Sequence, residues 1–188
     1  MKVFWTRRTD RFARTALPHL ASLYRIARQM ADAHTAEDLV QETYLRAWKY
    51  FDTFDLATNC RAWLIRILRN VWIDRYRHQR LEIPLAENNA TVVEPYYDWE
   101  DGFLKNELSK ELAQALSELP AEYRWAVLLV DVEELSYQQI AEVMSCPIGT
   151  VMSRINRGRR MLARLLRSYA QEPGRASELT KKKAQEKL

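Results

Sequence analysis

Apolar residues recur every three or four positions along most of the chain, a spacing that predicts α-helices. Between residues 10 and 31 the repeat predicts one helix. A capping box at Thr35 and Asp38 predicts a second helix that runs to about residue 51, and a third is expected from about residue 60 to 79. The stripes of the first two helices comprise Phe12, Ala16, Leu20, Leu23, Ala27, Met30, Leu39, Val40, Thr43, Tyr44, Ala47 and Trp48. Three such helices form a small bundle.

A second bundle is predicted in the C-terminal half. Its helices are expected at residues 104–119, 121–132, 137–144 and 148–168. The intervening residues contain prolines, asparagines and many acids, which indicates an acidic linker. The pattern therefore divides the chain into a first domain at 10–80, the linker at 81–103, a second domain at 104–170 and a tail at 171–188 that is expected to be disordered. The predicted fold class is all-α, with two small helical bundles joined by the linker.

The segment from Ser136 to Leu166 has the layout of a helix-turn-helix. Ser136 can cap its first helix, Pro147 suits the first turn of its second helix, and Gly149 permits close approach to another helix or to a phosphate. One side of the second helix, an arc about 80° wide, is apolar. The opposite side comprises Met152, Ser153, Asn156, Arg157, Arg160 and Arg164. Such a face suits the DNA major groove; the alternative is a packed helix that is basic by chance.

Charge is unevenly distributed, although the formal net charge is only +4. Residues 61–80 carry six arginines against one acid, and residues 145–171 carry six arginines and no acid. Residues 82–118 carry nine acids against two lysines. Two cationic modules thus flank an acidic segment, which favours nucleic acid as a partner of the modules. The acidic segment either mimics nucleic-acid charge or is a plain solvated spacer.

The predicted helix at 60–79 has a cationic face of its own, on an arc of about 100°. That face comprises Arg66, Arg69, Asn70, Arg77 and Arg80. Aromatic residues crowd the same region, and arginines beside exposed rings suit single-stranded nucleic acid, because cations follow phosphates while rings stack on bases. Trp48 and Trp72 lie on apolar stripes and are interpreted as core. Phe54 and Trp63 are open between core packing and base contact.

Several functional classes find no support in the sequence. His19, His34 and His78 share no metal-ligand spacing, and no nucleophile elbow or phosphate-binding glycine loop is present, so no catalytic residue, metal, cofactor or small-molecule substrate is expected. Cys146 is interpreted as a packed turn residue, whereas Cys60 opens a predicted helix, where the pKa of a thiol can fall. No apolar run reaches the roughly 20 residues that span a bilayer. We expect a cytoplasmic protein without membrane insertion.

Three stretches carry a resemblance to a known family. AEDLVQETYLRAWKYFDTF and NCRAWLIRILRNVWIDRYR resemble sigma region 2, and LPAEYRWAVLLVDVEELSYQQIAEVMSCPIGTVMSRINRGRRML resembles region 4, of bacterial RNA polymerase sigma factors in the extracytoplasmic-function group. The likeness covers about residues 11–168. It implies a sigma-70 family initiation factor with core RNA polymerase, duplex promoter DNA, a melted promoter strand and an anti-sigma factor as partners. It also implies a stress response or an envelope or redox response.

The resemblance implies roles for individual residues as well. The face that docks on core polymerase comprises Asp38, Leu39, Gln41, Glu42 and Arg46. The set expected at the −10 element comprises Tyr50, Phe54, Trp63, Arg66, Arg69, Asn70 and Arg77. The set expected at the −35 element comprises Thr150, Met152, Ser153, Asn156, Arg157 and Arg160. Some relatives carry a basic residue at the position of Met152 and an aromatic one at that of Asn156, so the detailed −35 preference stays open.

Two other functions compete with this interpretation. A helix-turn-helix regulator that acts without being a polymerase subunit would bind DNA tightly by itself and would not need residues 35–51. A small nuclease or hydrolase is the second alternative, and the scattered histidines argue against it.

Overall fold

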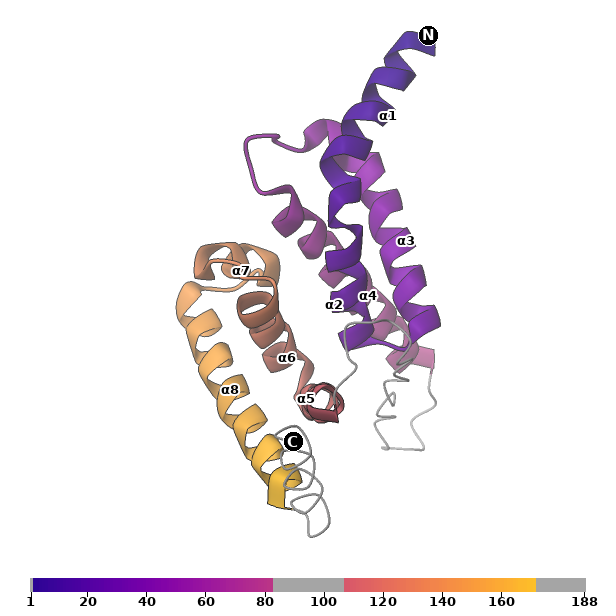
Figure 1. Cartoon of the computed structure of the whole chain (residues 1–188). Helices are drawn as coiled ribbons and strands as arrows, with labels where there is room; N and C mark the ends of the chain where they lie inside the picture. The colour runs from indigo at the N-terminus through magenta and orange to yellow at the C-terminus, as the bar shows by residue number, and fades with distance from the viewer. Residues whose placement is uncertain (1, 83–106, 172–188) are drawn as a thin grey trace, which may run out of the picture.

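The computed structural model describes residues 2–82 and 107–171, and within these ranges every regular element is helical. The N-terminal bundle comprises α1 (Lys2–Ala16), the 3-10 turn η1 (Leu17–His19), α2 (Leu20–Met30), α3 (Ala33–Tyr50), the 3-10 turn η2 (Phe51–Thr53) and α4 (Cys60–Glu82). The C-terminal bundle comprises α5 (Glu107–Glu118), α6 (Ala121–Val127), the π-helical turn η3 (Leu128–Val132), α7 (Tyr137–Met144) and α8 (Ile148–Gln171). The two groups of helices lie side by side (Figure 1). The all-α, two-bundle prediction is confirmed.

The first predicted helix was wrong in its extent. The helical segment begins at Lys2, and the 3-10 turn η1 separates α1 from α2 within the expected helix of residues 10–31. Pro18 lies in that turn, and proline removes a helical hydrogen bond because it has no N–H. Leu20, which directly follows the turn, is 47% exposed and therefore does not belong to the buried stripe.

The start of α3 also differs from the expectation. Asp32 is the N-cap, and its Oδ1 accepts a hydrogen bond from the backbone N–H of Thr35 at 2.9 Å. Thr35 is therefore inside the helix, and it does not open a capping box with Asp38. A carboxylate at the cap is favoured over a threonine because it also complements the helix dipole. The Thr35 hydrogen bonds lower the pKa of Asp32.

The helix-turn-helix forms as predicted. Ser136 and Gln139 make a reciprocal capping box at the start of α7. Ser145 ends α7 in the left-handed conformation, with φ of 51°. The close approach of helices occurs at Gly158, where an added Cβ would lie 2.7 Å from Val127 Cγ2. Gly149 makes no such approach, because nothing lies within 4 Å of a Cβ placed there.

The predicted linker and tail fall largely outside the described residues. Residues 81 and 82 belong to α4 and residue 171 to α8, so these helices extend beyond the expected ends. The bundles nevertheless contact one another directly. Their buried side chains form one continuous hydrophobic cluster, and Trp72 of α4 meets Trp125 of α6 edge to face at 6.1 Å between ring centroids.

Candidate nucleic-acid and partner interfaces

A polar depression lies between α3 and α4. Its lining comprises Asp38, Gln41, Glu42, Leu45, Arg46, Val71, Asp74 and Arg75. Arg46 donates to Glu42 Oε1 at 2.8 Å and to Asp74 Oδ2 at 2.9 Å, and these two hydrogen bonds, that to Asp74 first, raise the pKa of Arg46. Arg75 pairs with Asp38 at 3.2 Å. Two of the predicted polymerase-docking residues on α3, Asp38 and Arg46, are therefore held in place by partners on α4.

Leu39 is the exception among the predicted docking residues. It is 1% exposed and packs in the core of the N-terminal bundle, so its side chain offers no surface to a partner. Leu45 instead lies on the exposed side of α3 and is 66% exposed. The sequence carried a signal for it, because Leu45 follows Gln41 by one helical turn. An isolated exposed leucine is ordinary, but one at the edge of a charged depression is a candidate contact.

The loop after α3 gathers the predicted aromatic residues. Phe54 stacks on Trp63 of α4, with ring centroids 4.5 Å apart and planes 28° apart. Both rings are partly buried against the core, whereas Tyr50 is 51% exposed. Phe54 and Trp63 therefore pack against the core and against one another, and each ring also remains partly exposed to solvent.

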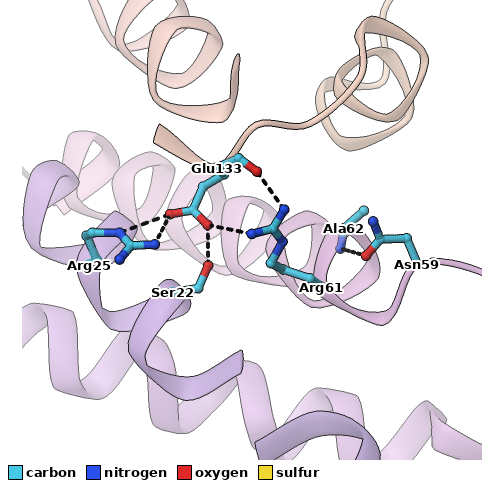
Figure 2. Close-up of polar contacts among 6 residues, drawn as sticks. All are labelled: Ser22, Arg25, Asn59, Arg61, Ala62 and Glu133. Carbon is cyan, nitrogen blue, oxygen red and sulfur yellow. Dashed lines mark hydrogen bonds and ion pairs between the residues drawn. The ribbon is translucent and has the colours of Figure 1, made fainter. Parts of the chain in front are cut away.

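Asp55 and Asn59 shape this loop. Asp55 accepts from the backbone N–H of Ala57 at 2.9 Å, which closes a turn. Asn59 caps α4, because its Oδ1 accepts from the backbone N–H of Ala62 at 3.1 Å (Figure 2). Asparagine is among the strongest helix-capping residues. The cap fixes where α4 begins and thereby where Trp63 meets Phe54.

The cationic face of α4 is only partly exposed. Arg66, Asn70 and Arg77 are exposed as predicted. Arg69 is half-buried, and burial, followed by the nearby Arg154 of α8, lowers the pKa of Arg69. The Nε of Arg69 is buried without a hydrogen-bond acceptor among the described residues. Arg69 therefore faces the C-terminal bundle in this arrangement.

The predicted reading face of α8 is open. Its exposed residues comprise Met152, Ser153, Asn156, Arg157, Arg160 and Arg164. Thr150 is half-buried at the helix start, and its carbonyl accepts from the Ser153 hydroxyl at 2.9 Å. Val151 and Ile155, on the opposite side, are at most 1% exposed. The helix therefore packs through its apolar side and presents its polar side outward.

Two arginines of α8 lie beside this face and are paired within the bundle. Arg154 contacts Glu122 Oε2 at 2.9 Å, and Arg159 donates to the carboxylate of Asp131. The hydrogen bond to Asp131 raises the pKa of Arg159. Helix α8 has no acidic residue of its own, and these two arginines pair instead with acidic residues of α6 and η3.

The cysteines are separate and differ in their surroundings. Burial raises the pKa of Cys60 to about 11, so the possibility that the helix start lowers it is wrong. Cys146 lies in the turn before α8, where its Sγ accepts from Arg154 at 3.6 Å. Within residues 2–82 and 107–171, no group of histidine, cysteine and acidic side chains could hold a metal ion. None of the described helices is both long and apolar enough to cross a membrane.

Both bundles match known sequence families. Residues 16–82 match the family described as Sigma-70 region 2, and residues 109–162 match Sigma-70, region 4. The chain is 34% identical over 168 residues to the ECF RNA polymerase sigma factor SigW of Bacillus subtilis (strain 168), covering 84% of this chain and 90% of the relative. It is 38% identical over 135 residues to EcfG, an ECF RNA polymerase sigma factor of Rhodopseudomonas palustris (strain TIE-1), covering 72% and 73%.

Solved structures agree with the sequence comparison. The sigma factor RpoE, in complex with the anti-sigma factor NepR from Bartonella quintana, superposes with a TM-score of 0.66 at 30% identity, over 83% of this chain and 96% of that one. CnrH, in complex with the cytosolic domain of CnrY, superposes with a TM-score of 0.59 at 27% identity, over 86% and 88%.

Proposed function

The chain belongs to the extracytoplasmic-function group of sigma-70 family RNA polymerase sigma factors, and on that premise we propose how its surfaces divide the work of transcription initiation. The depression between α3 and α4 contacts core polymerase. The outward face of α8 reads the duplex −35 element, and the loop at 52–59 with the start of α4 captures a base of the melted −10 element. No covalent step is assigned to the chain.

Polymerase docking is supported by the exposure and rigidity of the α3 side chains. Gln41 is exposed, and Asp38 and Glu42 are held by arginines that are themselves partly exposed. A preformed charged surface loses little conformational entropy when a partner binds. Leu45 supplies an apolar contact at the same surface.

Duplex reading is supported by the sidedness of α8. The exposed arginines follow phosphates, which gives affinity without sequence information. Asn156 has the two-sided hydrogen-bonding amide that pairs with adenine in the major groove, and Met152 can contact only apolar groups such as a thymine methyl. Met152 and Asn156 are therefore suited to A·T pairs more than to guanine.

Base capture is the step that distinguishes a sigma factor from an ordinary helix-turn-helix protein. The observation that carries it is the stacking of Phe54, in the loop, on Trp63 of α4. Trp63 lies one turn before exposed Arg66 on the same helix. Unpairing a base costs a few kcal/mol, and stacking on an aromatic ring offsets that cost. Asn70 adds a hydrogen-bonding group to the same face.

The relatives indicate the setting in which this protein acts. RpoE and CnrH are each described in complex with a second protein, which for RpoE is an anti-sigma factor. An anti-sigma factor is therefore the proposed regulator of this chain as well, in the cytoplasm and in response to a stress or to an envelope or redox signal. The acidic linker and the C-terminal tail are given no role.

Run-off transcription tests the central proposal. Core polymerase mixed with the chain is expected to transcribe from a promoter mapped by transcript start sites after overproduction. A chain that binds core normally and supports no transcript would contradict it. The alternative of a polymerase-independent regulator predicts tight promoter binding without core, and a pull-down with core polymerase separates the two.

Phe54→Ala tests base capture. We expect open-complex formation, measured by permanganate reactivity of unpaired thymines, to fall about tenfold, because one base–aromatic stack is worth about 1–3 kcal/mol. Duplex binding of the free chain is expected to change little. Phe54→Tyr is the matched control, because it keeps the ring and should keep the open complex. Equal losses of melting and of duplex binding in Phe54→Ala would exclude the capture role.

A further inference from the structure

The side chain of Glu133 is a fully buried carboxylate at the junction of the two bundles. Glu133 ends η3 of the C-terminal bundle and is 0% exposed. Its carboxylate accepts from Arg25 at 2.8 Å and from the hydroxyl of Ser22, and it lies 3.5 Å from Arg61 (Figure 2). Arg61 also donates to the Glu133 carbonyl oxygen at 2.6 Å.

All of these partners belong to the N-terminal bundle. Ser22 and Arg25 are on α2, and Arg61 is on α4 (Figure 2). A buried carboxylate without partners is strongly unfavourable, whereas one held by two arginines and a hydroxyl is tolerated. Glu133 is thus stable in a buried position only while the bundles stay together. In a separated chain it would be hydrated.

Further contacts join the same two bundles. Arg124 of α6 donates to the backbone carbonyl of Gln29 at 3.1 Å. Trp125 is 2% exposed and meets the ring of Trp72 on α4. Burial of so large an aromatic side chain is a major favourable contribution to an interface. The contact between bundles therefore combines a buried aromatic pair with the polar Glu133 cluster.

This arrangement covers part of the face that we assign to the melted strand. A groove separates α4 from α7, and its lining comprises Thr58, Asn59, Ala62, Trp63, Arg66, Gln139, Glu142 and Val143. Glu142 brings a negative charge to the groove that Arg66 lines. Arg69, farther along α4, is half-buried and close to Arg154 of α8. A single DNA strand that ran along α4 would collide with α7 in this position.

We infer that the free chain inhibits itself: the Glu133–Arg25–Arg61–Ser22 cluster latches the C-terminal bundle over α4, so that α7 blocks the melted strand until the bundles separate. The claim that α7 blocks the melted strand rests on the proposed role of α4. The claim that Glu133 holds the chain closed does not depend on that role.

Two features of the closed chain favour separation of the bundles when nucleic acid is present. The closed chain places Arg69 and Arg154, two cations, near one another, and the Nε of Arg69 has no acceptor among the described residues. A phosphate would provide that acceptor for Arg69 once the bundles part. A ligand that binds only the open form has its apparent affinity reduced by the fraction of open chain.

Distance measurements on the full chain test the latch. Spin labels at exposed Glu37 of α3 and Ala163 of α8, in a chain whose two cysteines are replaced by alanine, report the separation of the bundles. The parent chain is expected to give a distance distribution dominated by one short distance, with at most a small long-distance component. Glu133→Ala and Arg25→Ala are each expected to add longer distances. Arg25→Ala leaves the C-terminal bundle unaltered, which separates opening of the latch from damage to η3.

Asp131→Asn is the matched control, because it breaks an arginine–carboxylate pair within the C-terminal bundle. It should leave the distances unchanged. A broad, long distribution in the parent chain, or a short one that persists in both latch variants, would overturn the closed arrangement.

Binding of a fluorescent single-stranded DNA oligonucleotide of random sequence tests the functional half. Both latch variants should bind it about tenfold more tightly than the parent if about a tenth of the parent is open. Opening without any gain in affinity would overturn the blocking role of α7. If the distances respond but no variant binds the oligonucleotide, the latch stands and the proposed role of α4 fails.

Discussion

At the scale of single residues, Cys60 shows how packing can reverse an expectation from local structure. A thiol at a helix start is expected to ionise readily, but burial raises the pKa of Cys60 from 9.0 to about 11. At about pH 8 its thiolate fraction is then about a hundredfold lower than that of an ordinary cysteine. We expect native Cys60 to be alkylated by iodoacetamide about a hundredfold more slowly, as measured by mass spectrometry of the modified peptide.

The same protein in denaturant provides the control for Cys60. There the slow reaction should disappear, because unfolding restores the ordinary pKa. In the native protein the rate should rise about tenfold per pH unit until the pH approaches 11. Native and denatured rates that agree at about pH 8 would contradict the raised pKa.

At the scale of elements, Gly158 fixes the distance between α6 and α8. A Cβ at this position would lie 2.7 Å from Val127 Cγ2 and 3.3 Å from the carbonyl oxygen of Tyr123. Helix propensity alone predicts that Gly158→Ala stabilises the helix by about 1 kcal/mol. Overpacking costs about 1–3 kcal/mol, and a rigid backbone carbonyl cannot move aside, so the clash prevails. We expect urea denaturation to show a net loss of up to about 2 kcal/mol.

Gly149→Ala is the natural comparison for Gly158→Ala. It lies in the same helix, with nothing within 4 Å of the added methyl group. Only the propensity term remains there, so the unfolding free energy should rise by up to about 1 kcal/mol. Equal effects of the two substitutions would show that the α6–α8 contact is not as close as described.

The elements also show what the sequence could and could not predict. The periods of apolar residues predicted α7 and α8, and Ser136 was expected to cap a helix of this motif, because these features depend on local spacing and local hydrogen bonds. The sequence did not predict the break at Pro18 or the cap at Asp32. Both positions carried local signals that compete with the apolar period: a proline inside an otherwise helical pattern, and an aspartate three residues before Thr35. The sidedness of α8 was predicted because its apolar residues lie on one arc and Arg157, Arg160 and Arg164 lie opposite to it.

At the scale of the whole molecule, the relation between the bundles was beyond the reach of sequence patterns. Glu133 occurs beside Glu134 in a polar stretch, which is typical of a solvated turn. Its burial depends on Arg25 and Arg61, which are distant in sequence and whose own spacing gives no sign of a shared partner. The half-burial of Arg69 likewise depends on the contact between the two bundles. The predicted −10 residues are therefore present but not all accessible, a property that only the assembled chain determines.

The clustering of arginines on one face of α8 leads to a prediction about how DNA affinity depends on salt concentration. The net charge of +4 is small, but the face of α8 that we propose reads the duplex carries arginines with no acid among them. Each phosphate contact steepens the fall of log affinity with log salt concentration by about 0.9. Arg160→Gln should therefore weaken duplex binding and lower the steepness of that dependence by about one, as measured by fluorescence anisotropy over a salt series.

Arg14→Gln makes the same charge change at an exposed site on α1, in the other bundle. If the affinity depended on the overall charge of the chain, the two substitutions would have equal effects. Because binding responds to the charges that meet the duplex, the slope should change for Arg160→Gln and stay as it is for Arg14→Gln.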